Sequence, residues 1–301
     1  MRLFAIFGAI CLVTGPAQMA SAKVGDGGDQ CSLQFAENSA TITMLAANLG
    51  PGGSAFGEQA IRVIAEGGGA NNGSCRGTLR ISRLSGAGSF PDYRLTARGR
   101  PIAPSISEAI GDARNQLNLS LSGNKASRSI DLRTSLPTGW GLVAGRHSEQ
   151  LQLTLLDASG EVADRMALNV VLEIPKAVDV MLVGATGDGQ TASIDLGDLS
   201  QTEASRSAPF GLRIWSTSAY TYGFSSANGG SLRHALDMDT IPYQLFIEGR
   251  PIMLSAGRVE FSSATPSAAR GDLYRLGIQV PARRSIAGRY SDRITVSVSA
   301  I

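Results

Sequence analysis

The sequence is poor in the residues on which catalysis and metal binding usually depend. It has 2 histidines and 3 cysteines among 301 residues. The histidines, His147 and His234, stand far apart in unlike contexts, so the sequence offers no paired imidazoles for a metal and little basis for a Ser-His-Asp arrangement. We therefore predict no catalytic residues, no enzyme activity, no metal site and no cofactor.

An excess of one charge is lacking as well. The chain has 27 Lys+Arg against 25 Asp+Glu, a net charge of +2, and no basic run. Proteins that bind nucleic acid usually concentrate basic residues in a patch, so we predict no nucleic-acid partner. Aromatic residues make up only 6%, but 43% of the residues are hydrophobic, which is enough for two domain-sized cores.

Long apolar runs are restricted to the N-terminus. One Arg precedes an apolar run over residues 3–13, and residues 20–22 have the small-x-small pattern of a signal-peptidase site. No later window approaches the ~18 apolar residues that a membrane-spanning helix needs. We predict a signal peptide over residues 1–22 and an exported mature chain that begins near Lys23.

Two cysteines remain after the predicted leader, which contains Cys11, is removed. In an oxidising compartment the simplest interpretation of Cys31 and Cys75 is one disulfide. Such a bridge closes a loop of about 45 residues and is worth roughly 4 kcal/mol in the chain-entropy model. Two buried free thiols are the alternative.

Three matches in the same order indicate an internal duplication. Leu-Arg-Ile occurs at 79–81 and 212–214, the pattern Y-x-L-x-x-x-G-R-P-I at 93–102 and 243–252, and A-G-R-x-S at 144–148 and 287–291. A period this long means two copies of a domain rather than a solenoid. Short segments of period-two alternation between Gly, Ser and Asn predict an all-β chain of two antiparallel sandwiches. We place the domains at residues 23–175 and 176–301.

The two copies differ at their ends. After its A-G-R-x-S motif, the first copy continues through an alternating segment at residues 166–174, which we interpret as a closing strand. The second copy stops after Ile294, Val296 and Val298, which we expect to face inward. A sandwich without its last strand exposes an apolar groove and unpaired backbone, so we predict that it accepts a strand from another chain. The alternative is that residues 178–183 close the sheet.

Part of the second copy resembles a known family. Residues 220–222, 226–232, 241–245 and above all the ending A-G-R-Y-S-D at 287–292 resemble the spore coat protein U-like domain of archaic chaperone-usher pili. The similarity covers about 120 residues of that copy and extends more distantly to the first. The second copy departs from the family in having no cysteine, whereas many shaft subunits of the family carry a disulfide.

The resemblance implies a fold, partners and a location. Subunits of that family are immunoglobulin-like, pilin-type sandwiches without a last strand, so the resemblance implies two tandem sandwiches of which the C-terminal one is incomplete. Its partners would be a periplasmic pilus chaperone, an outer-membrane usher and the next pilus subunit. The expected strand-acceptor groove contains Tyr290, Ile294, Val296 and Val298.

The segment before Cys31 indicates where this chain would be placed in a pilus. Residues 23–30 hold one Val among Gly and Asp, so they lack the apolar anchors of a donor strand. An acceptor that donates no strand would occupy the tip of the fibre. We therefore expect a tip adhesin that is exported through the periplasm to the cell surface and mediates attachment to surfaces in biofilm formation.

Five apolar residues in candidate loops are predicted to contact a surface, because exposed apolar loops bind apolar surfaces by removing area from water. They are Leu49, Phe56, Phe90, Trp140 and Leu142. The alternative for Trp140 and Phe56 is that they pack into the edge of the domain. Two other functions stay open: a non-adhesive structural pilus or coat subunit, and a secreted β-sandwich enzyme or binding module.

Overall fold

A computed structural model describes residues 31–66, 74–84, 90–104, 113–122, 126–187 and 191–301. The proposed signal peptide and residues 23–30 lie outside these ranges, so both predictions about them stay predictions. In the described residues, no helix is long and apolar enough to cross a membrane. Apart from two 3-10 helices, η1 (Ala113–Asn115) and η2 (Leu254–Ala256), their regular structure is β-strand, which confirms the all-β prediction.

The first sandwich consists of two five-stranded sheets, with the strand orders β1-β3-β8-β5-β6 and β2-β10-β9-β4-β7. Its pairs are antiparallel except that β10 runs parallel to β2. The strands are β1 (Ser32–Phe35), β2 (Ser39–Leu45), β3 (Ser54–Glu66), β4 (Ser74–Arg83), β5 (Arg94–Ala97), β6 (Arg100–Ile102), β7 (Gln116–Ser122), β8 (Ser127–Pro137), β9 (Gly145–Leu156) and β10 (Val162–Ile174).

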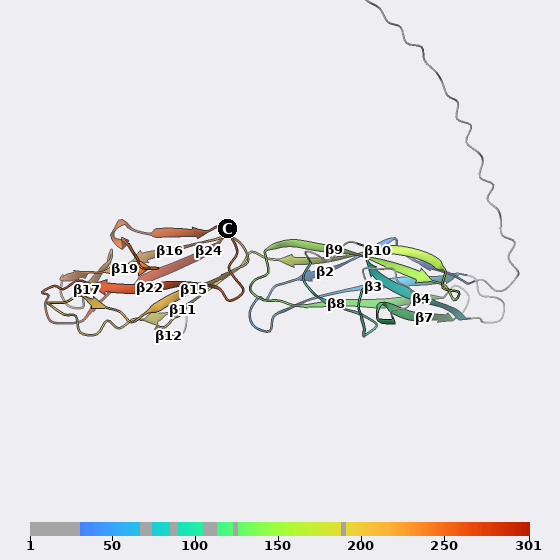
Figure 1. The fold of residues 1–301 in the computed structure, drawn as a ribbon, viewed down its shortest axis with the longest axis horizontal. Coiled ribbons are helices and arrows are strands. Elements are labelled where there is room, and N and C mark those ends of the chain that lie inside the picture. The colour runs from blue at the N-terminus through green and yellow to red at the C-terminus, as the bar shows by residue number, and fades with distance from the viewer. Residues whose placement is uncertain (1–30, 67–73, 85–89, 105–112, 123–125, 188–190) are drawn as a thin grey trace, which may run out of the picture.

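The second sandwich has one larger sheet of order β11-β15-β22-β19-β20, with β14 paired to β22, and smaller sheets β21-β16-β24, β18-β17-β23 and β12-β13. Its strands are β11 (Val178–Val183), β12 (Thr186–Gly187), β13 (Ala192–Ser193), β14 (Ser205–Arg206), β15 (Phe210–Ser216), β16 (Tyr220–Ser226), β17 (Ser231–His234), β18 (Thr240–Pro242), β19 (Gln244–Ile247), β20 (Arg250–Ile252), β21 (Val259–Ser263), β22 (Asp272–Val280), β23 (Tyr290–Ser291) and β24 (Ile294–Ala300). The two sandwiches lie end to end (Figure 1).

Period-two alternation produces these strands. In β2, Ala40, Ile42 and Met44 are buried while Thr41 and Thr43 between them are exposed. Successive side chains of a strand point to opposite faces, so alternation places one face in the core and the other in water.

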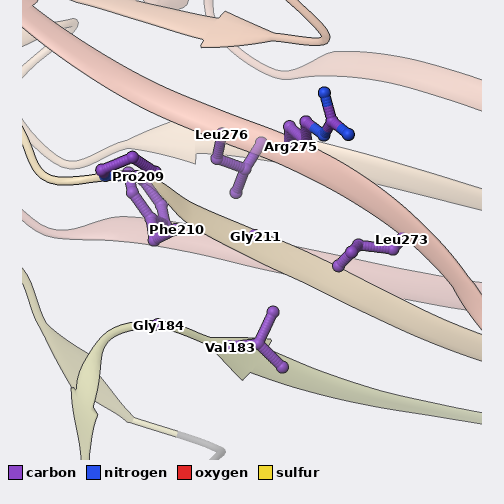
Figure 2. Close-up of a pocket in the computed structure, with 8 residues that line it drawn as sticks. All are labelled: Val183, Gly184, Pro209, Phe210, Gly211, Leu273, Arg275 and Leu276. Atoms are coloured by element: carbon purple, nitrogen blue, oxygen red, sulfur yellow. The ribbon is translucent and has the colours of Figure 1, made fainter.

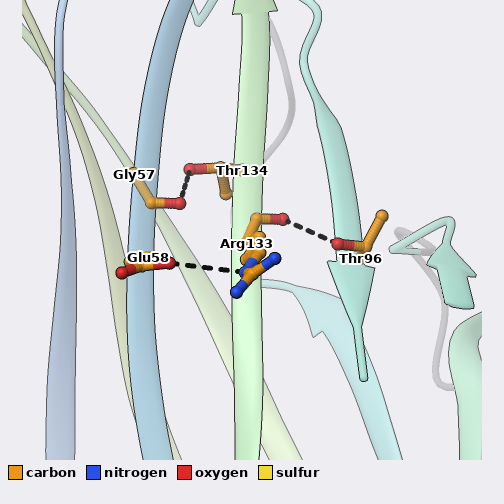
Figure 3. A network of polar contacts seen from close by, with 5 residues as sticks. All are labelled: Gly57, Glu58, Thr96, Arg133 and Thr134. Carbon is orange, nitrogen blue, oxygen red and sulfur yellow. Dashed lines mark hydrogen bonds and ion pairs between the residues drawn. The ribbon is translucent and has the colours of Figure 1, made fainter. Parts of the chain in front are cut away.

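Polar contacts cross from strand to strand in the first sheet (Figure 3). An ion pair joins Arg133 Nε on β8 to Glu58 Oε2 on β3 at 3.3 Å. The Thr134 hydroxyl donates to the Gly57 carbonyl oxygen at 3.3 Å, and the Thr96 hydroxyl on β5 donates to the Arg133 carbonyl oxygen at 3.5 Å. Both members of the ion pair are exposed, so the pair contributes at most about 1 kcal/mol.

The longest sequence repeat is one structural hairpin used twice. In β5–β6, Leu95 pairs with Ile102, and in β19–β20, Leu245 pairs with Ile252 in the same register. Each turn has two residues with positive φ: Arg98 (53°) and Gly99 (78°), then Glu248 (48°) and Gly249 (76°). Two positive φ values are the signature of a tight type I′ hairpin turn, which explains the glycine of G-R-P-I.

The shortest repeat, Leu-Arg-Ile, does not mark equivalent strands of the two sandwiches. Residues 79–81 lie in β4, between β7 and β9, whereas residues 212–214 lie in β15, between β11 and β22 in the other sheet. By strand order, β4 corresponds to β16 and β15 to β3. Three residues of an alternating pattern are too few to identify a strand, because every half-buried strand favours the same pattern. The duplication itself is supported by the matching strand orders.

Candidate functional site

The first sandwich shows what a completed edge looks like. Strand β9 pairs on one side with β4 and on the other with β10 along its whole length. In this register Leu151 pairs with Leu168 and Leu153 with Met166. Leu151, Leu153 and Leu155 are each 0% exposed. The closing strand β10 therefore seals the core at this edge.

The corresponding edge of the second sandwich is open. Strand β24 pairs with β16, with Tyr222 opposite Val298 and Phe224 opposite Val296. In the part of the chain that the structure describes, no strand pairs with the other edge of β24, which we call the open edge. The A-G-R-x-S repeat relates the two strands by 143 residues (287 − 144), so Ile294, Val296 and Val298 correspond to Leu151, Leu153 and Leu155. These three side chains are only half-buried.

The opposite wall of the open edge is β11. Val178, Val180 and Leu182 point toward the core and are half-buried. Strand β11 lies near β24 but forms its ladder with β15, where Val180 pairs with Ile214. The alternative in which residues 178–183 close the sheet is therefore wrong: they form an edge strand of the opposite sheet.

Aromatic side chains form the core behind the open edge. Tyr220, Tyr222 and Phe224 on β16 are buried. The Tyr222 ring centroid lies 4.5 Å from that of Tyr274 and 5.3 Å from that of Phe261. The Tyr220 hydroxyl donates to Asp272 Oδ2 at 2.6 Å. Burial, first of all, and then this carboxylate raise the pKa of Tyr220, so its hydroxyl stays protonated.

Tyr290, which was predicted to line the groove, lies at the N-terminal end of the open edge and has its own partners. Its hydroxyl contacts Asp239 Oδ2 at 2.7 Å and the Ile286 carbonyl oxygen at 2.9 Å. Its ring centroid lies 5.0 Å from that of His234. The hydrogen bond from Tyr290 is the main reason that the pKa of Asp239 lies below its ordinary value. Tyr290 thus fastens the end of the edge to the β17–β18 hairpin.

Asp292 is a hydrogen-bonding centre that sequence reasoning missed. Its carboxylate accepts from the Ser226 hydroxyl at 2.5 Å, the Tyr243 hydroxyl at 2.6 Å and the Asn228 backbone N–H at 3.0 Å. All four residues lie within the segments that resemble the spore coat protein U-like domain. The aspartate of A-G-R-Y-S-D therefore has a structural role: it joins the β16–β17 turn to the start of β19.

The first sandwich has an acid at the same place. Offset by 143 residues, Asp292 corresponds to Glu149, whose Oε1 lies 3.1 Å from Arg83 Nε in a buried position. Tyr93, the counterpart of Tyr243 in the hairpin repeat, lies beside this pair: burial, and then Glu149, raise the pKa of Tyr93. An acid one position after A-G-R-x-S in both copies was the signal that could have found this tyrosine–acid arrangement.

The predicted disulfide is confirmed. Cys31 and Cys75 are bonded, with Cα atoms 5.6 Å apart. The bond ties the start of β1 to β4 at the end of the first sandwich that faces away from the second.

The structure separates the five residues predicted to contact a surface. Leu49 is 6% exposed and belongs to the core, which corrects its assignment to a contact surface. Phe90 is half-buried against Tyr93, with ring centroids 5.4 Å apart. Phe56 is 69% exposed, the most exposed of the five.

Trp140 and Leu142 are half-buried against the first core, and their loop reaches the second sandwich. The Ala144 N–H donates to the Thr217 carbonyl oxygen at 2.7 Å, and a Cβ on Gly141 would lie 2.8 Å from Ala269 Cβ. This loop therefore lies at the junction and not at the free end. The free end holds the disulfide and the β9–β10 turn, which the loop predictions did not include.

A shallow hollow of about 290 Å³ lies on the larger sheet of the second sandwich, over β11, β15 and β22 (Figure 2). Gly211 provides the space, because any side chain there would contact Leu273 and Val183. The hollow is mainly apolar and carries the one charge of Arg275. Its residues are Val183, Gly184, Pro209, Phe210, Gly211, Leu273, Arg275 and Leu276.

Among the described residues, no group of three His, Cys, Asp or Glu side chains could hold a metal ion.

Comparison with known proteins gives similarities in structure alone. No family model matches the sequence, and no curated protein matches it either. The chaperone–tip adhesion subunit complex CsuC–CsuE of the archaic Csu pili of Acinetobacter baumannii is similar at 13% identity and a TM-score of 0.43, over 89% of this chain and 99% of that one.

Two further solved structures are similar. The CupB6 tip adhesin of Pseudomonas aeruginosa matches at 11% identity and a TM-score of 0.37, over 89% of this chain and 93% of that one. CfaE, the adhesive subunit of CFA/I fimbria of enterotoxigenic Escherichia coli, matches at 11% identity and a TM-score of 0.35, over 91% and 99%. At these identities and TM-scores the similarities concern the fold alone, so any inference about function has to come from the residues of this chain.

Proposed function

We propose that this chain is the tip adhesin of an archaic chaperone-usher pilus and that its second sandwich accepts a strand from another protein. Residues 23–175 would form the complete, attaching domain and residues 176–301 the acceptor domain. The observation that carries the proposal is the open edge of β24, where Ile294, Val296 and Val298 are half-buried although their counterparts in β9 are fully buried.

The energetic reason is the amount of apolar surface that a closing strand covers. In the first sandwich, β10 buries Met166, Leu168, Val170, Leu172 and Ile174. At about 1.5–3 kcal/mol for each of these five buried side chains, such a strand is worth on the order of 8–15 kcal/mol as an upper estimate. This is comparable to the ~5–15 kcal/mol stability of a whole domain. An acceptor domain without its strand is therefore weakly stable and exposed to aggregation.

The partners follow from this need. During export, a periplasmic pilus chaperone would cover the open edge, and the next pilus subunit would replace it at the outer-membrane usher. Main-chain hydrogen bonds between the donated strand and β24 would provide the affinity. Alternate apolar side chains of the donated strand, packed on Ile294 and Val296, would provide the specificity. The chain would then be displayed at the cell surface at the end of the fibre.

The test gives the second sandwich the strand that the first one has. The full chain is extended after Ile301 by a copy of its own residues 159–175, which contain the end of the turn and β10, so that Ile301 takes the place of Ala158 at the 143-residue offset. By the 143-residue offset, the copies of Met166 and Leu168 then stand opposite Val296 and Ile294. We expect the amides of β24 to gain strong protection from hydrogen exchange and the second sandwich to unfold at higher denaturant concentration.

The matched control is the same extension with Asp in place of the copied Met166, Leu168 and Val170. This control should leave β24 unprotected, because the added backbone can no longer bury an apolar face. Equal protection of β24 in the unextended chain, the extended chain and the control contradicts strand acceptance.

Attachment is tested separately in the cells that make the chain. Deletion of the gene should leave pili visible but abolish attachment. Phe56→Ser, at the most exposed of the five predicted contact residues, should lower attachment at normal pilus assembly; unchanged attachment would remove Phe56 from the contact surface. Pili that attach normally after the deletion would favour the non-adhesive structural subunit instead.

A further inference from the structure

The two ends of the open edge differ. At its C-terminal end, the Ile301 N–H donates to the Ala219 carbonyl oxygen at 2.8 Å. Two residues before Ala219, the Thr217 carbonyl oxygen accepts a hydrogen bond from the Ala144 N–H of the first sandwich. The Thr217 hydroxyl donates to the Pro175 carbonyl oxygen at 2.8 Å. This end therefore lies at the junction, as the position of the C-terminus in Figure 1 also shows. The first sandwich occupies the space beyond it.

The other end of the open edge is free of the first sandwich. There β23 continues the line of β24 and pairs with β17, with Tyr290 opposite His234. The Ala235 N–H donates to the Arg289 carbonyl oxygen at 2.9 Å, and the chain then turns through residues 235–239 into β18. We call residues 235–239 the hairpin tip. It lies at the end of the molecule opposite to the first sandwich (Figure 1).

The hairpin tip presents apolar side chains to water. Leu236 is 94% exposed and Met238 79% exposed, the two highest values among the large apolar residues of the described chain. Ile286 beside them is 51% exposed, and its N–H contacts Asp239 Oδ2 at 3.3 Å. Isolated exposed apolar residues need no explanation, but a group of them on one projecting hairpin is typical of a contact surface.

The tip is ordered by hydrogen bonds. The Leu236 N–H donates to His234 Nδ1 at 3.2 Å, and Asp239 accepts from its neighbour, the Thr240 N–H, at 3.0 Å, as well as from Tyr290. Because these bonds fix the loop, Leu236 and Met238 are held outward without a loss of backbone freedom on binding. An open hollow of about 790 Å³ adjoins them, and its lining also includes Asn228, Arg233, His234 and Ser291.

The surroundings of the tip are basic. Arg233, Arg283, Arg284 and Arg289 are exposed around it. Asp237 is the exposed acid of the tip, since Asp239 is engaged by Tyr290 and Ile286. The chain as a whole has a net charge of only +2, so this is a local concentration of positive charge. A partner surface with acidic side chains around an apolar centre would complement it.

We propose that the hairpin tip, with Ile286 and the four arginines, is a second docking surface for the folded body of the next pilus subunit, whose terminal strand fills the open edge in the fibre. This inference rests on the proposed function. A strand on β24 must connect to its own folded domain at one of the two ends, and the first sandwich fills the junction end. The folded domain of the strand donor therefore lies at the hairpin tip. There the apolar and basic side chains of the tip complement a donor surface that is apolar at its centre and acidic around it.

The test uses a photo-crosslinking amino acid at two positions of the full chain, in the cells that naturally make it. One position is Thr295, exposed on β24 at the open edge, and the other is Leu236. We expect both to form an adduct with the same protein, identified by mass spectrometry. Leu273, 46% exposed on the larger sheet away from both sites, is the control position and should not capture this protein.

A pair of variants measures the strength of the contact. Leu236→Asp combined with Met238→Asp should lower the yield of the Thr295 adduct about tenfold, which corresponds to about 1.4 kcal/mol of binding free energy lost with the two apolar contacts. Leu273→Asp should leave that yield unchanged. No adduct at Thr295 would contradict strand acceptance itself. An adduct at Thr295 without the same partner at Leu236, or an unchanged yield in the double variant, would overturn only the second docking surface.

Discussion

The two sandwiches have the same strand order in one of their sheets and differ in the other sheet. The orders β1-β3-β8-β5-β6 and β11-β15-β22-β19-β20 match strand for strand, whereas β7-β4-β9-β10-β2 corresponds to β21-β16-β24 and stops there. Where β10 is present, the apolar residues of β9 are fully buried; at β24, where none of the described strands takes that place, they are half-buried. The comparison teaches that one strand decides whether a core of this kind is closed, because it covers both the apolar face and the backbone of its neighbour.

The second sandwich also joins several of its strand ends and turns by polar bonds. It contains three tyrosine–aspartate hydrogen bonds, from Tyr220 to Asp272, Tyr243 to Asp292 and Tyr290 to Asp239. For the two part-buried bonds, from Tyr220 and Tyr243, a contribution of about 1.5–3 kcal/mol is typical of a hydrogen bond to a charged acceptor, whereas the Tyr290–Asp239 bond is exposed to water. All three bonds hold strand ends or turns in place. The first sandwich has one tyrosine–acid pair, Tyr93 beside Glu149, and in addition the bonded pair Cys31 and Cys75.

The largest expected effect concerns that disulfide. Replacing Cys31 and Cys75 by Ala should lower the free energy of unfolding of the first sandwich by about 4 kcal/mol, since the loop in the unfolded chain is no longer closed. Hydrogen exchange resolved by strand should show the loss in β1–β10 and none in β11–β24. An equal loss in both would mean that the two sandwiches unfold as one unit.

The next effect compares equivalent positions of the two edges. Leu151→Ala in β9 should cost about 2–5 kcal/mol, because it leaves a cavity in a sealed core. Ile294→Ala in β24 should cost only about 1 kcal/mol, because the side chain is half-buried and solvent fills the space. Denaturant unfolding of each sandwich measures both. In the chain extended by the copy of β10, the cost of Ile294→Ala should rise into the range of Leu151→Ala; a cost that is already large in the unextended chain would show that the edge is closed.

A third prediction concerns the repeated acid. Asp292→Asn should lower the stability of the second sandwich by about 1–3 kcal/mol, since the Ser226 and Tyr243 hydroxyls lose a charged acceptor. Asp195→Asn, at an exposed turn of the same sandwich, is the control. Thermal unfolding should separate the two variants. Equal melting temperatures would remove Asp292 as a hydrogen-bonding centre.

The smallest effect is a dependence on acid. The pKa of Asp239 is lowered in the folded chain, mainly by the hydrogen bond from Tyr290. Its contribution to stability is therefore present above the ordinary pKa of an aspartate and is lost as the pH falls through the lowered pKa. Asp239→Asn should flatten the fall in stability of the second sandwich between neutral and acidic pH. An unchanged pH profile in the variant would assign the acid sensitivity to other carboxylates.

Sequence reasoning succeeded where the signal is local. The hairpin repeat and the period-two strands follow from backbone preferences within a few residues, and both are found. The glycines of the A-G-R repeat show the limit. Gly145 has a φ of 134° with open space around it, whereas a side chain on Gly288 would collide with the His234 ring. One motif thus meets two different requirements, and the second depends on a residue 54 positions away (288 − 234).

The sequence by itself determined that the chain is β-structured, that it is duplicated, which cysteines pair and which residues of the last strand face inward. These properties depend on side-chain alternation and on a small choice of partners. Only the tertiary structure decided that β11 belongs to the opposite sheet, that the Trp140 loop lies at the junction, and that the open edge ends beside Leu236 and Met238. Strand pairing joins residues far apart in the chain, and short alternating segments fit many partners equally well, so the choice is made by the packing of the whole sandwich.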